Sequence, residues 1–177
     1  MRDGSPIPDA SRAAPGRTGR LRMLVGFPLL FGALDLAYLH LKTPYLKPWL
    51  IDWLTVRPAA WLADALLAVP VTARGHVVLV GNVRLSVLNG CEGIDAMLML
   101  LAAVAVLPAP WSARLWGAAL GLPIVYLANQ LRIVALVWAR VEAPALFDIG
   151  HGLLGPLGVI AVAALFFAWW ARRAARP

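Results

Sequence analysis

Three side chains whose types suit acyl-transfer chemistry occur in separate parts of the sequence. Cys91 stands in NGCEGIDAM, Arg132 in NQLRIV and His151 in GHG. A thiol is a strong nucleophile only as the thiolate, and a neighbouring histidine or cation favours that ionisation. A guanidinium in a low-dielectric site stabilises the negative charge that develops on an attacked carbonyl oxygen. The three residues are therefore a candidate nucleophile, oxyanion stabiliser and acid–base group.

Two further polar residues could support this group. Asn129 and Arg132 are three residues apart and share one helix face, so Asn129 could orient the guanidinium or donate to the same oxyanion. Asp148 stands three residues before His151 and could fix the tautomer of its imidazole. Taken singly, a buried cysteine, a snorkelling arginine and a capping histidine are ordinary structural features. The functional interpretation depends on whether the side chains meet in space.

The composition predicts an integral membrane protein. Of 177 residues, 61% are hydrophobic and 14% are charged, which is more apolar surface than a soluble domain of this length can bury. The net charge of +7 comes from arginines and lysines that flank apolar segments. They form no basic stripe with interleaved aromatic residues, so nucleic acid is not an expected partner. A single cysteine excludes an intrachain disulfide.

Hydropathy predicts an all-α fold with about four transmembrane helices. The predicted spans are residues 22–41, 93–107, 115–138 and 151–170. Residues 1–20 are rich in proline, glycine and arginine and are expected to form a disordered basic cytoplasmic tail. Residues 21–177 are then a single membrane-embedded domain, with a loop at 140–150 before the last span.

The segment between the first two spans, residues 42–92, is predicted to lie outside the membrane core. Its first half, to about residue 70, combines tryptophans with scattered charges and prolines, as interfacial helices do. Residues 71–87 alternate apolar and polar side chains around Gly81-Asn82, which predicts a small β-hairpin.

The distribution of basic residues predicts the orientation of the spans. Arginines cluster in the N-terminal tail, at Arg114 and at the C-terminus, so the positive-inside rule places these parts in the cytoplasm. Cys91 then lies at the outer mouth of the second span. Arg132 is about 27 Å further along its helix than Arg114, near the outer edge of a hydrocarbon core about 30 Å thick. His151 begins the fourth span after an outer loop, so all three reactive side chains reach the same leaflet.

The segments CEGI (91–94) and NQLRIV (129–134), followed by His151, resemble the motifs of the exosortase/archaeosortase family over about residues 80–170. The resemblance implies a multi-pass cysteine peptidase or transpeptidase of the bacterial inner membrane, with its active site at the outer face. Its expected partners are exported proteins with a C-terminal signal, made of a short motif, a transmembrane helix and a basic cluster. It implies that Cys91 forms a thioester, that Arg132 stabilises the oxyanion or substrate, and that His151 is the general acid/base, with Asn129 in support.

The chain departs from the larger family members in having fewer predicted spans, so it resembles compact variants such as the exosortase H type. Glu92, beside the candidate nucleophile, would oppose thiolate formation unless it is paired or points away. The expected partners are the substrate proteins and membrane lipids. No cofactor is expected, and no metal either, because three scattered histidines and one cysteine lack zinc-site spacing. The alternative is a non-enzymatic membrane assembly or transport subunit, in which the three reactive residues lie far apart.

Overall fold

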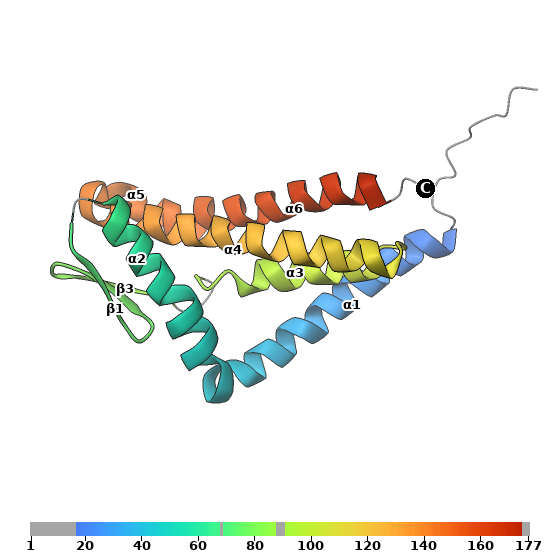
Figure 1. The fold of residues 1–177 in the computed structure, drawn as a ribbon, viewed down its shortest axis with the longest axis horizontal. Helices are drawn as coiled ribbons and strands as arrows, with labels where there is room; N and C mark the ends of the chain where they lie inside the picture. The colour runs from blue at the N-terminus through green and yellow to red at the C-terminus, as the bar shows by residue number, and fades with distance from the viewer. Residues whose placement is uncertain (1–16, 68, 88–90, 175–177) are drawn as a thin grey trace, which may run out of the picture.

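The computed structural model describes residues 17–67, 69–87 and 91–174, which form a helical bundle with a small sheet at one end (Figure 1). The α-helices are α1 (Arg17–Leu41), α2 (Arg57–Leu66), α3 (Ile94–Val106), α4 (Trp111–Glu142), α5 (Pro144–Ile149) and α6 (Gly155–Ala174). Two π-helical segments are η1 (Lys42–Val56) and η2 (Gly150–Leu154). The strands are β1 (Val71–Arg74), β2 (Val77–Val80) and β3 (Val83–Ser86). The chain is thus mostly helical, as predicted.

The helices α3, α4 and α6 lie side by side along the bundle, and α1 slants along α3 (Figure 1). The chain runs in one direction through α1 and α4 and in the other through α3 and α6. The start of α1 and the end of α6 therefore lie at the same end of the molecule, away from the sheet. This arrangement fits the predicted even number of spans, although the side of the membrane stays a prediction.

In the part of the chain that the structure describes, three helical segments are long and apolar enough to cross a membrane. They are Met23–Leu41, Trp111–Glu142 and Pro144–Ala174, and they match three of the four predicted spans. The remaining predicted span, 93–107, corresponds to α3, which is apolar but has 13 residues. Its rise of about 20 Å is less than the roughly 30 Å of the hydrocarbon core. A count of four spans therefore stays a prediction.

The outer faces of these helices carry large apolar side chains. Leu24 on α1 is 75% exposed, Trp111 on α4 is 74% exposed and Leu165 on α6 is 71% exposed. A soluble monomer rarely exposes so much contiguous apolar surface. These faces suit contact with lipid, in agreement with the composition.

The predicted boundaries are wrong at two places. Helix α1 begins at Arg17, inside the predicted tail 1–20, because adding residues to an existing helix is much easier than nucleating one; residues 1–16 lie outside the described part. The predicted loop 140–150 is also absent, since α4 continues to Glu142 and α5 begins at Pro144. This proline occupies the first turn of a helix, where its missing N–H costs nothing.

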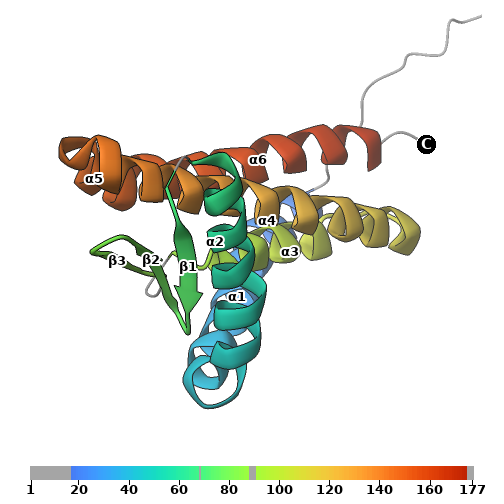
Figure 2. The same ribbon diagram turned by 60° about the vertical axis from the view of Figure 1, so that its left-hand side comes forward.

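The predicted hairpin is part of a three-stranded antiparallel sheet with the order β1-β2-β3. Val71 pairs with Val80 in one ladder, and Val80 pairs with Val83 in the other. Each turn contains a glycine with positive φ, Gly75 at +58° and Gly81 at +55°, a conformation that glycine adopts without strain. The sheet contacts α2 and α4 (Figure 2), so α4 reaches from the bundle into the sheet end.

Two hydrophobic clusters stabilise the two ends of the bundle. The sheet-end cluster joins η1, α2, the strands, Cys91 and the second half of α4. The opposite cluster joins α3, the first half of α4 and α6. There a Cβ on Gly121 would lie 2.4 Å from Cε1 of Phe166, so glycine allows α4 and α6 to approach closely. At the same end Trp170 donates from Nε1 to the carbonyl of Ala113 at 2.9 Å.

Candidate active site

The structure brings Cys91, Arg132 and His151 together at the sheet end of the bundle. The Sγ of Cys91 lies 3.1 Å from Nε2 of His151, and Nη2 of Arg132 donates to the same Sγ at 3.7 Å. Cys91 precedes α3, Arg132 lies on α4 and His151 lies on η2. Three elements far apart in the sequence thus supply one cluster, and the wide separation that the non-enzymatic alternative expects is not found.

Asn129 connects the cysteine segment to the arginine. Its Nδ2 donates to the carbonyl oxygens of Cys91, at 3.1 Å, and Glu92, at 2.9 Å. Its Oδ1 accepts a hydrogen bond from Nη1 of Arg132 at 3.4 Å. Both amide hydrogens are therefore used by the backbone, so of the two predicted roles the geometry supports the orienting one.

Two glycines that the sequence analysis did not single out make room for this cluster. Gly93 has φ +73°, and a Cβ there would lie 2.4 Å from Cγ of Asn129. Gly155 is similar, because its Cβ would lie 2.6 Å from Nε of Arg132 and from the carbonyl oxygen of Gly150. Gly93 belongs to the CEGI segment, so the sequence motif could have pointed to it. No sequence pattern marks Gly155 as part of the site.

His151 is half-buried and its ring stacks on Phe147, with ring centroids 5.6 Å apart and an interplanar angle of 17°. Asp148 is exposed, and in the described part of the chain no hydrogen bond or ion pair joins it to His151. The structure therefore does not bring Asp148 into the cluster. Phe147, four positions before His151, lies against the ring instead.

The electrostatic environment of Cys91 favours the neutral thiol. Burial raises the pKa of the Cys91 thiol above its ordinary value, the nearby Arg132 cation lowers that pKa, and Glu92 raises it. The thiol is then protonated at neutral pH and needs a base before it can attack. Nε2 of His151 is at hydrogen-bonding distance from the thiol to serve as that base.

Glu92 is buried beside the thiol and forms an ion pair with Lys42, the first residue of η1. Its side chain is 3% exposed. The sequence predicts that Glu92 opposes thiolate formation unless its carboxylate is paired, and the ion pair with Lys42 meets this condition. Lys42 was not among the residues predicted for the site, because no sequence spacing relates it to Glu92.

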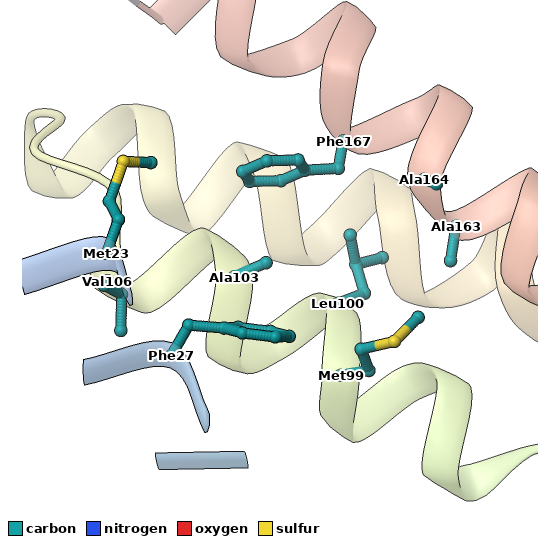
Figure 3. A pocket seen from close by; sticks show the side chains of 9 residues that line it. All are labelled: Met23, Phe27, Met99, Leu100, Ala103, Val106, Ala163, Ala164 and Phe167. Carbon is teal, nitrogen blue, oxygen red and sulfur yellow. The ribbon is translucent and has the colours of Figure 1, made fainter. Parts of the chain in front are cut away.

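Two apolar grooves differ in how they relate to the cluster. The first lies between α4 and the α5–η2–α6 segment, encloses about 570 Å³, and includes Arg132, Gly150, Gly155 and Gly158 in its lining. The second encloses about 330 Å³ between α1, α3 and α6 and is lined by apolar side chains such as Phe167 (Figure 3). Of the two, only the first reaches a member of the cysteine cluster.

A resident metal ion has no evident ligand set in the described part of the chain. There, no group of three or more histidine, cysteine, aspartate or glutamate side chains is placed to hold one.

The comparison with known families covers most of the chain. The sequence model of the transmembrane exosortases matches residues 17–170, a range that includes Cys91, Arg132 and His151. Neither a curated protein nor a solved structure gives a significant match. The matched range extends well beyond the motifs that first suggested the resemblance. The chain therefore belongs to the transmembrane exosortase family.

Proposed function

We propose that this protein is a membrane-embedded cysteine peptidase or transpeptidase that cleaves the C-terminal sorting signal of exported proteins. One observation carries the proposal, namely that Sγ of Cys91 lies within reach of both Nε2 of His151 and Nη2 of Arg132. Membership of a family of membrane proteases and transpeptidases supports the same reaction class.

The first half of the reaction is acylation. Nε2 of His151 accepts the thiol proton, and Sγ of Cys91 attacks the carbonyl carbon of the scissile peptide bond. The carbonyl π electrons move onto oxygen, beside the guanidinium of Arg132, which stabilises the resulting charge. When the tetrahedral intermediate collapses, the C–N bond breaks and the departing amine takes the proton from the imidazolium.

The second half releases the product from the thioester on Cys91. A water molecule, or an amine on an acceptor, attacks the thioester carbonyl while Nε2 of His151 takes its proton. The C–S bond then breaks, and the sulfur regains a proton from the imidazolium. Hydrolysis and transfer therefore use the same three side chains and differ only in the attacking group.

The groove between α4 and α6 supports a substrate whose cleavage site is next to an apolar helix. Its lining is apolar except near Arg132, so an apolar segment in the groove would leave an adjacent peptide bond near the guanidinium and thiol. The basic residues Arg172 and Arg173 end α6 at the opposite end of the bundle. With those arginines in the cytoplasm, the cysteine cluster faces the outer side of the bacterial inner membrane.

The test is co-expression with a reporter protein that ends in a short motif, one transmembrane helix and a basic cluster. Wild type is expected to convert the reporter into a shorter form on an immunoblot, whereas Cys91→Ala and Cys91→Ser leave it uncleaved. Ser112→Ala is the matched control, because this exposed residue lies in the first turn of α4, at the other end of the bundle. Unchanged processing by Cys91→Ala would exclude the thiol mechanism.

A further inference from the structure

Lys42 and Glu92 form a largely buried ion pair next to the thiol of Cys91. The side chains are 15% and 3% exposed, respectively. The ammonium also lies 5.6 Å from the ring centroid of Tyr38, in the last part of α1, within the range of a cation–π contact. The pair therefore joins the end of α1 to the Cys-Glu-Gly turn that precedes α3.

Because the pair lies next to Cys91, its charges affect how easily the thiol ionises. A carboxylate next to a thiol opposes formation of the thiolate, because two negative charges repel each other. Glu92 acts on the thiol in this direction and Arg132 acts in the opposite one. The desolvation cost of a buried ion pair can cancel its Coulomb energy, so stability alone explains this pair poorly.

Other ionisable groups surround the pair on both sides. Asp35 and Tyr38 from α1 and Asp95 from α3 lie within electrostatic range of one another, and Tyr38 and Asp95 also lie within range of Glu92. Across the thiol are Arg132 from α4 and His151 from η2. Lys42 is the cation that the contacts in the described part of the chain place beside these carboxylates.

We propose that Lys42 is a positioning residue of the thiol site. Its ammonium cancels the charge of Glu92 beside Cys91, so that Nε2 of His151 can remove the thiol proton at neutral pH. The proposal rests on the proposed thiol chemistry and adds to it a residue outside the family motifs CEGI and NQLRIV. Lys42 acts through Glu92 and does not touch the reacting atoms.

The pH dependence of iodoacetamide alkylation of the full-length protein in detergent micelles tests this role. Cys91 is the only cysteine of the chain, so alkylation reports one site, and only the thiolate reacts. Lys42→Met removes the ammonium that pairs with Glu92 and should raise the alkylation midpoint by about one pH unit. Glu92→Gln leaves the ammonium uncancelled and should lower the midpoint below that of wild type.

Compensation and conservative variants complete the test. Lys42→Met/Glu92→Gln, which removes both charges, should restore the wild-type midpoint, and Lys42→Arg should keep it. Lys47→Met, which removes a cation from the same π-helical segment, is the matched control and should not shift it. Where Lys42→Met folds poorly, Glu92→Gln and the double variant still decide the question.

The outcomes separate this proposal from a structural role and from the proposed function. An ion pair that only stabilises the fold would lower the thermal midpoint of Lys42→Met and leave every alkylation midpoint at the wild-type value, which would overturn the proposal. Because alkylation requires no substrate, shifted midpoints together with unchanged processing by Cys91→Ala would retain the role of Lys42 and reject the peptidase.

Discussion

The two ends of the bundle are built by opposite principles. In the described part of the chain, the buried polar side chains belong to the sheet end and the segments that enter it: Thr55, Glu92, Asn129, Gln130 and Arg132. The opposite end buries alanine, leucine, valine, phenylalanine and tryptophan. Burying polar groups costs free energy unless they are bonded. Asn129 and Arg132 bond to the Cys91–Glu92 segment, so the sheet end combines burial with chemistry, whereas the opposite end combines burial with close packing.

The largest effect on function is expected from removing His151, the proposed base of the sheet-end site. His151→Ala should reduce the rate of reporter processing by about 10²- to 10⁴-fold, with little change in thermal stability, because the ring is only half-buried. The measurement is the initial rate of processing in vesicles. His76→Ala, in the turn between β1 and β2, is the control, and a loss of less than tenfold for His151→Ala would contradict the assigned role.

The next effect concerns the guanidinium. Arg132→Gln should reduce the processing rate by about 10²- to 10³-fold, the usual consequence of removing one oxyanion donor. It should also move the alkylation midpoint of Cys91 to higher pH, because the cation that lowers the thiol pKa is lost. Arg84→Gln, on the exposed side of β3, should change neither quantity. A wild-type processing rate in Arg132→Gln would show that the guanidinium does not contact the reacting carbonyl.

A single methyl group should distinguish a glycine of the site from a glycine that is not crowded. Gly93→Ala introduces a side chain at φ +73° and 2.4 Å from Cγ of Asn129, so it should lower both processing and the thermal midpoint, by more than about 1 kcal/mol in stability. At Gly32, on α1, an added Cβ meets no atom within 4 Å, so Gly32→Ala should be tolerated. Equal behaviour of the two variants would refute the tight contact between Gly93 and Asn129.

The smallest effect on function is expected at the opposite end. Gly121→Ala places a Cβ 2.4 Å from Phe166, and overpacking of this kind costs about 1–3 kcal/mol. Thermal unfolding should therefore begin at lower temperature, while the processing rate per folded molecule stays at the wild-type level. A specific loss of activity without loss of stability would mean that the two ends are coupled.

The members of the cysteine cluster could be picked out from the sequence because the chemistry they suit is specific to their residue types. Cys91, Arg132 and His151 follow from residue type combined with the depth that hydropathy assigns, and Asn129 follows from its helical spacing to Arg132. Gly155 and Lys42 could not be found this way, because their roles depend on contacts between segments that are far apart in the sequence. No local pattern marks either contact.

Parts of the scaffold could not be predicted from the sequence, for local reasons. The turn at Gly81-Asn82 was recognised, but the equivalent turn at Gly75-His76 was not, so one strand of the sheet was missed. The sequence pattern places Pro144 in a loop, although a proline also begins helices. The π-helical geometry of η1 and η2 has no sequence signature comparable to a cap or a turn residue.

Mass spectrometry of acid-quenched reactions tests the central claim most directly. Wild-type protein mixed with the reporter and quenched early in the reaction should carry the N-terminal part of the reporter on the Cys91 peptide, as a thioester that neutral hydroxylamine releases. Cys91→Ala should show neither the adduct nor the processed reporter. Processing by Cys91→Ala at the wild-type rate would contradict the claim that the thiol held by Arg132 and His151 performs the acyl transfer.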